Sequence, residues 1–150
     1  MSNSYLYSVV EIKESLLLNS LISFAETESI DLMQEDLFSA RDQVLDIHMA
    51  EELQNYIIQI IMNTRETKNL DNDLNRWLDY GASPRATISL DRCARAAAWL
   101  AGRDFVTPED IQNMAFDVLR HRLILTYEAE AEGVDTDQVI EKLIALTPVA

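Results

Sequence analysis

The sequence predicts an all-α protein, a helical bundle of about five to six helices that leaves room for one short two-stranded ribbon. Apolar residues recur at helical spacing in several stretches, and the 150-residue chain has only three glycines and three prolines. Two of the expected helices begin with a hydroxyl residue followed by proline, a typical helix start. With 48% hydrophobic residues, the chain is long enough to bury a core of its own.

We expect helices at roughly 9–25, 35–43, 50–67, 84–101, 108–121 and 136–146. The third, fifth and sixth of these carry apolar stripes at the i, i+3, i+4 spacing, over residues 53–61, 111–119 and 139–144. The fourth is rich in alanine, which permits close approach of a neighbouring helix, and Gly102 is a suitable stop for it.

Two segments alternate weakly between apolar and polar residues. We expect Val44–His48 and Arg122–Tyr127 to pair as the short ribbon. The polar stretch Lys68–Tyr80 is interpreted as a long connection, with Trp77 anchoring it to the core.

The formal net charge of −14 argues against nucleic acid or an anionic membrane as a partner. No apolar run reaches the roughly 18 residues that a membrane span needs, so none is expected. The first four residues lack the positive charge of a signal peptide, and we expect a cytoplasmic protein. The lone Cys93, set among alanines, is interpreted as a small buried hydrophobe.

The segment Gly81–Ala86 starts a helix with an unusual charge. Ser83 is a suitable N-cap and Pro84 suits the first helical position, so Arg85 falls in the first turn. The helix dipole disfavours a cation there by roughly 0.3–1 kcal/mol. Arg85 is therefore either a solvated surface residue or a cation placed to meet an anion.

A second helix start in the same chain carries the charges that the dipole favours. Thr107 and Pro108 are followed by Glu109 and Asp110, with Asp110 placed three residues after the cap as in a capping box. The contrast makes Arg85 the candidate site residue. Six of the nine arginines lie between residues 85 and 122, so one face can be locally basic on an acidic protein.

Catalytic motifs are missing from the sequence. Three scattered glycines cannot form a phosphate-binding loop, and His48 and His121 are too far apart in sequence to suggest a metal site. We expect the chain by itself to have no enzymatic activity and no metal site.

Several motifs in order resemble the C-terminal lid of MoxR-type AAA+ ATPases. They are Tyr56–Arg65, Tyr80–Ala86 with its Ser-Pro-Arg core, Arg95–Ala96, Gly102–Ile111 and Val118–Leu123. The resemblance divides the chain into residues 1–34, a helical segment from a missing ATPase core, and residues 35–150, the lid. The sequence has no Walker A or Walker B motif, so it looks like a lid separated from its core.

The resemblance implies that Arg85 is the sensor-2 residue, which reaches toward the γ-phosphate of ATP, with Ser83 and Pro84 forming the helix start. Arg92 lies seven residues on, near the same helix face, and is a weaker candidate. The implied cofactor is ATP with Mg in the full-length protein, and none for the isolated chain. The implied partners are the chain's own AAA+ core, neighbouring subunits of a ring, and a client protein that is matured in a chaperone-like way.

Other interpretations remain open at this stage. The chain is alternatively a stand-alone acidic helical adaptor that binds a protein, or the lid of a magnesium-chelatase-type ATPase subunit. A small enzyme with a buried carboxylate site is a third class, supported only by the abundance of acids.

Overall fold

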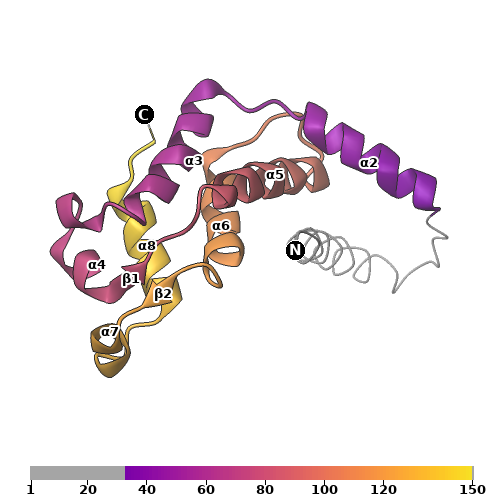
Figure 1. Cartoon of the computed structure of the whole chain (residues 1–150). Coiled ribbons are helices and arrows are strands. Elements are labelled where there is room, and N and C mark those ends of the chain that lie inside the picture. Colours follow the sequence, from indigo (N-terminus) through magenta and orange to yellow (C-terminus); the bar gives the residue numbers. More distant parts are fainter. Residues whose placement is uncertain (1–32, 150) are drawn as a thin grey trace. The chain divides into compact units, whose positions relative to one another are not determined.

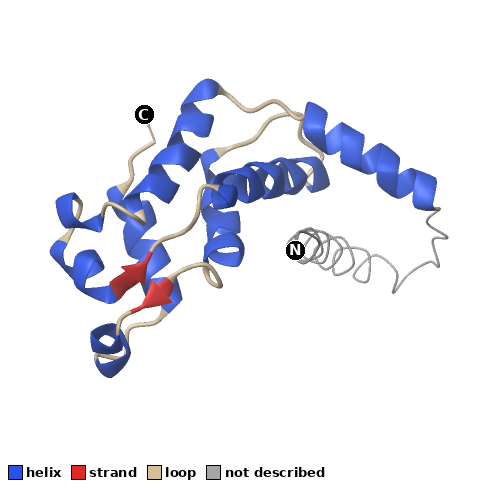
Figure 2. Ribbon diagram, in the orientation of Figure 1, coloured by secondary structure: helices blue, strands red, loops and turns tan. Residues whose placement is uncertain are grey.

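The computed structural model describes residues 33–149, which form seven α-helices and one two-stranded ribbon (Figures 1 and 2). The helices are α2 (Gln34–Asp46), α3 (Glu51–Asn63), α4 (Asn72–Trp77), α5 (Arg85–Leu100), α6 (Pro108–Leu119), α7 (Tyr127–Ala131) and α8 (Thr136–Leu146). A 3₁₀ turn covers Thr67–Asn69. The expected all-α class is confirmed.

The chain separates into two compact units, Met1–Asp42 and Gln43–Ala150, with the boundary inside α2. In the first unit, the described residues are the start of α2, where the Arg41 guanidinium lies 5.9 Å from the centre of the Phe38 ring. The expected helix at 9–25 lies outside the described residues.

The core of the second unit is built by helix faces that the periodicity predicted. On α3 the buried residues are Leu53, Tyr56, Ile57, Ile60 and Ile61, the predicted stripe. α5 packs against α6 and α3, and α8 packs against α6, α3 and α4. Three alanines of α5 are completely buried, so the helix backbones approach closely, as expected: Ala86, Ala94 and Ala98.

The turn from α5 to α6 is fixed by a glycine and an ion pair. Gly102 ends α5 with φ +70°, the left-handed conformation that favours glycine. Arg103 then donates two hydrogen bonds to Asp110, Nη1 to Oδ2 at 2.8 Å and Nη2 to Oδ1 at 2.6 Å. Asp110 also accepts from the Thr107 backbone N–H at 2.8 Å, so the predicted capping box is present.

The ribbon has a different first strand from the one expected. β1 (Leu78–Tyr80) pairs antiparallel with β2 (Ile124–Leu125), with Leu78 opposite Leu125 and Tyr80 opposite Ile124. The predicted partner Val44–His48 is wrong. Val44 is the buried residue of α2, so this segment begins as helix, and Ile47, just after the helix end at Asp46, is also buried. Only His48 in that segment makes a β-bridge, with Phe105.

The expected long connection at Lys68–Tyr80 is also wrong, because this stretch contains α4 and β1. Asp71 caps α4 by accepting from the N–H groups of Asp73 and Leu74 at 2.9 and 3.0 Å. Leu74 is fully buried and ties the short helix to the core. Trp77 does pack against the core, as predicted.

α7 was not expected either. Its N-cap Thr126 accepts from the Ala129 N–H at 3.2 Å, and Ala129 is fully buried.

The Arg103–Asp110 pair makes stability depend on pH. Burial alone would raise the pKa of Asp110, but the hydrogen bonds from Arg103 and Thr107 outweigh it and hold the pKa below the ordinary 3.8. Because the folded pKa is depressed, this stabilisation is present above pH 3.8 and is lost as the pH falls through the folded value. We predict that Asp110→Asn lowers the free energy of unfolding at pH 7 by about 1–3 kcal/mol.

Urea unfolding at pH 7 and pH 3 measures this effect. The difference between wild type and Asp110→Asn should shrink at pH 3, since the wild-type carboxylate loses its advantage on protonation. Glu109→Gln, an exposed acid in the same first turn of α6, is the matched control and should cost only a few tenths of a kcal/mol. A difference that stays constant between the two pH values would contradict the prediction.

Candidate functional site

The candidate site is the start of α5, where the structure places the three residues singled out in the sequence. Pro84 has φ −56° and ψ −23°, already helical, and α5 begins at Arg85, one residue later than expected. The first turn closes through the Ala86 N–H, which donates to the Ser83 carbonyl at 2.8 Å, and the Thr87 N–H, which donates to the Pro84 carbonyl at 3.1 Å. The expected N-cap at Ser83 is wrong, because the N-cap position is Pro84 and no side-chain cap hydrogen bond is present; Ser83 contributes through its backbone carbonyl.

Arg85 is exposed, while the residues around it are anchored. Ala82 and Ala86 on either side are 1% and 0% exposed, so the backbone that carries the arginine is fixed to the core. Arg92 is also exposed on the same helix, two turns further on. The structure therefore places both arginines on accessible parts of α5, with Arg85 at the N-terminal end of the helix.

The position of this helix start is set by a contact with the end of α3. The buried Thr64 hydroxyl accepts from the Ala82 N–H at 2.9 Å and donates to the Ile61 carbonyl at 2.7 Å. One side chain thus joins the last turn of α3 to the loop that leads into α5. Neither Thr64 nor its partner carried a sequence signal for this contact.

Gly81 is required by the same contact. A Cβ atom at this position would lie 2.2 Å from the Thr64 carbonyl oxygen, far inside van der Waals contact. The requirement comes from close approach of two backbones, because Gly81 does not have a positive φ. We call the contact among Thr64, Gly81 and Ala82 the Thr64 lock.

Next to the lock lies a polar cavity of about 400 Å³. Basic and acidic residues both line it, including Arg65, Lys68 and Asp79. Arg65 is the last residue of the first motif that carries the resemblance, and the structure brings it to the same cavity as Gly81. The cavity has no single sign of charge that would select an anion.

A second arginine, Arg122 in the segment after α6, contacts α5. Arg122 donates to the Val118 carbonyl, and its Nη2 lies 3.3 Å from the Ser89 hydroxyl oxygen. The Ser89 hydroxyl in turn donates to the Arg85 carbonyl at 3.4 Å. Burial lowers the pKa of Arg122, which nevertheless remains a cation close to the first turns of α5. The expectation of Arg122 in the ribbon is wrong, because β2 begins at Ile124 and Arg122 contacts Ser89 of α5.

Arg95 and Arg103 have structural contacts. Arg95 pairs with Asp91 at 3.2 Å and donates to the Ile47 carbonyl. Arg103 is held by Asp110 in an ion pair. Among residues 33–149, no group of three or more histidines, cysteines, aspartates or glutamates could hold a metal ion. Cys93 is buried, as expected. In the same range, no helix is both long and apolar enough to cross a membrane.

The part of the chain that contains α5 is also similar to known proteins. Residues 74–143 match the family model of the AAA lid domain. The chain is 40% identical over 93 residues to Chaperone MoxR1 of Mycobacterium tuberculosis, covering 61% of this chain and 25% of that protein. It is 46% identical over 68 residues to Protein MoxR of Methylorubrum extorquens, covering 44% and 20% of the two chains.

A solved structure is also similar. It is the crystal structure of a candidate ATPase from Cytophaga hutchinsonii, with a TM-score of 0.70 and 40% identity over 73% of this chain and 33% of that one. The chain spans between 20% and 36% of the length of the curated relatives that it matches. The similarity therefore concerns one part of longer proteins.

The Thr64 lock generates a stability prediction. We expect Gly81→Ala to lower the free energy of unfolding by about 1–3 kcal/mol, because the new methyl group must push the backbone of Thr64 away. Ser83→Ala is the matched control two residues on, where the side chain is exposed and a change within about 0.5 kcal/mol is expected. Urea unfolding of both variants measures the difference. Equal stability of the two variants would show that the loop can move away from α3 at no cost.

Proposed function

We propose, from the premise that residues 74–143 form an AAA lid domain of the MoxR type, that this chain couples the nucleotide state of an ATPase core to movement of the lid. The observation that carries the proposal is the exposed Arg85 at the anchored start of α5. The dipole of the helix disfavours this cation when no anion is near, and a phosphate group reverses the balance.

Arg85 would act as the sensor-2 residue. A guanidinium can donate two parallel hydrogen bonds to a phosphate, and the positive end of the helix dipole favours the same anion. ATP with Mg would supply the γ-phosphate whose loss removes the partner of Arg85. The affinity of the lid for the core then differs between nucleotide states, which is what a conformational coupling requires.

The chain supplies only part of such a site. Its own residues offer a cation and the positive end of a helix dipole, whereas holding a nucleotide also needs a phosphate-binding loop and Mg ligands. We therefore propose that the nucleotide binds between this lid and an AAA+ core, and that residues 1–34 lead from that core to the lid at 35–150. A ring of such subunits in the cytoplasm, acting in chaperone-like maturation of a client protein, completes the proposed setting.

Arg92 is proposed as an auxiliary cation. It lies on the exposed side of α5 two turns from Arg85, too far along the helix to share the donors of the first turn. Its effect on a phosphate at the helix start would be a long-range one, weakened by solvent screening.

We predict that Arg85→Ala, made in the protein that contains both core and lid, slows steady-state ATP hydrolysis by about tenfold or more, the equivalent of one charge-assisted hydrogen bond. Arg85→Lys should recover only part of the rate, because lysine cannot form the bidentate contact. Arg92→Ala, on the same helix, should change the rate by less than about threefold, because the proposed effect of Arg92 is long-range and screened by solvent.

The fold of each variant is checked by thermal unfolding. Arg85 is exposed and its neighbours carry the packing, so the melting temperature should not change. Unchanged hydrolysis in a folded Arg85→Ala protein would remove the sensor role from this residue.

A further inference from the structure

The two-stranded ribbon has one buried and one exposed face. Leu78 in β1 and Leu123, just before β2, are buried, whereas Tyr80 and Ile124, directly opposite each other in the ribbon, are 64% and 55% exposed. An irregularity between Leu78 and Tyr80 breaks the strand register, which redirects the Tyr80 side chain away from the core. Two large apolar side chains are thereby placed next to each other in solvent.

Tyr127 extends this exposed surface. It is 92% exposed, although it is the first residue of α7, whose N-cap is hydrogen-bonded to the end of α4. Thr126, the preceding residue, donates from its hydroxyl to the Arg76 carbonyl at 2.6 Å and from its N–H to the Trp77 carbonyl at 2.9 Å. The side chain of Trp77 donates to Glu132 at 3.0 Å. A fixed backbone therefore presents an aromatic ring that contributes nothing to the core.

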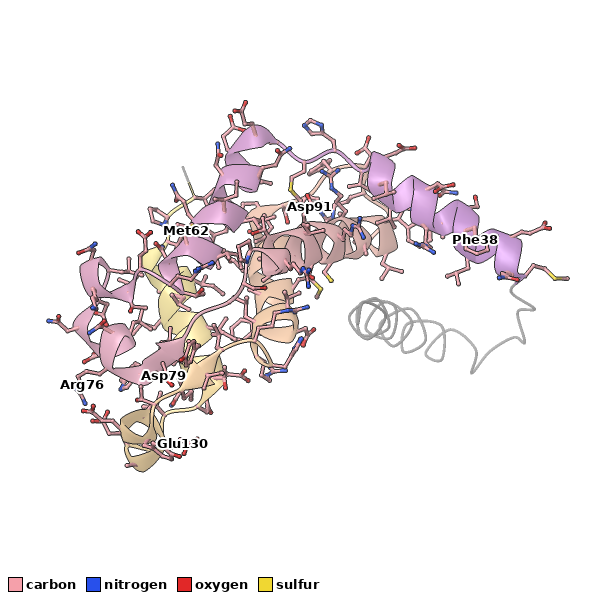
Figure 3. All side chains as sticks on the ribbon, in the orientation of Figure 1. Phe38, Met62, Arg76, Asp79, Asp91 and Glu130 are labelled. Atoms are coloured by element: carbon pink, nitrogen blue, oxygen red, sulfur yellow. The ribbon has the colours of Figure 1, made fainter. Side chains whose placement is uncertain are left out.

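The exposed surface is flanked by carboxylates. Asp79 on β1 and Glu130 on α7 lie at the same end of the molecule (Figure 3), and neither has an ion-pair partner among the described residues. The nearby Arg76 does not cancel their charge, because Glu128 and Glu132 already pair with it. Both carboxylates line an open cavity of about 400 Å³ that also contains Ile124, Leu125, Thr126 and Tyr127.

We propose that this surface, the ribbon patch of Tyr80, Ile124 and Tyr127 with the flanking Asp79 and Glu130, binds a segment of a partner protein in which arginine or lysine stands beside a large apolar residue. Tyrosine rings attract cations through their faces and are frequent among the residues that dominate binding energy. The carboxylates would pair with the basic side chain, while the cavity would take its apolar neighbour. Nucleic acid is excluded as the occupant because it carries the same sign of charge as the patch.

The test uses the full 150-residue chain and three fluorescent synthetic peptides of equal length. In the first, adjacent arginine–leucine pairs are separated from one another by glycine. In the second, each arginine is replaced by glutamate, and in the third, each leucine is replaced by serine. Fluorescence anisotropy should show binding of the first peptide and at least about fivefold weaker binding of the other two.

Variants of the chain separate the patch from general acidity. Tyr127→Ser and Glu130→Lys should each weaken binding of the first peptide by about fivefold or more. Glu141→Lys makes the same change of charge at an exposed position on α8 and should alter binding by less than about twofold. All three substituted side chains are exposed, so thermal unfolding should show that the variants remain folded.

Three results would overturn the proposal. The first is no binding of the arginine–leucine peptide. The second is an equal loss of binding in Glu130→Lys and Glu141→Lys, which would mean attraction to the net charge alone. The third is self-association of the chain in sedimentation that disappears in Tyr127→Ser, which would make a second copy the occupant. None of these measurements involves nucleotide, so the outcome is independent of the role proposed for Arg85.

Discussion

The Thr64 lock is the contact on which the geometry of the second unit depends. The Thr64 hydroxyl joins the end of α3 to the Ala82 N–H, and the absence of a side chain at Gly81 lets the two backbones meet. A buried hydroxyl that both donates and accepts leaves no polar group unpaired, so the contact adds specificity at no desolvation cost. Because α3 is anchored by a fully packed apolar face, the loop before α5 inherits its position from the core.

This constraint explains how the start of α5 can carry Arg85 although the helix dipole disfavours a cation at that position. The unfavourable interaction of Arg85 with the dipole is of the order of 0.3–1 kcal/mol. Burial of Ala82 and Ala86, together with the Thr64 hydrogen bonds, contributes more than that within five residues. The stability of this segment is thus supplied by the buried residues that flank Arg85.

The sequence predicted the long helices well because their apolar residues repeat over at least two turns. α8 was predicted at its observed bounds, and the capping box at Thr107 and Asp110 was readable from local chemistry alone. The short elements could not be predicted in the same way. α4 and α7 have six and five residues, too few for a periodicity to appear, and each depends on one buried residue contacting a distant part of the chain.

The candidate site residues also divide into those that local sequence indicates and those that only long-range contacts reveal. Arg85 was visible as a local conflict between residue type and position, so the sequence alone identified it. Thr64 and Arg122 could not be found, because their importance lies in contacts across 18 and 33 residues of sequence. A threonine at a helix end and an arginine in an Arg-His-Arg run have too many ordinary explanations. The prediction of the first ribbon strand was wrong for a related reason, since strand pairing is a long-range property that weak alternation does not specify.

The two proposed surfaces are linked by one short segment of chain. Tyr80 of the ribbon patch is followed at once by Gly81 of the Thr64 lock, and Arg85 lies four residues further on. A segment fixed at its middle cannot move at one end without straining the lock or carrying α3 with it. A change felt by Arg85 would therefore reach the ribbon patch as displacement of the whole helical unit, in the manner of rigid-body domain movement. On the proposed function, a partner bound at the ribbon patch would move together with the lid. The affinity of that partner for the protein would change between nucleotide states only if the partner also contacts the core. A contact that is equally strong in both states does not shift the equilibrium between them.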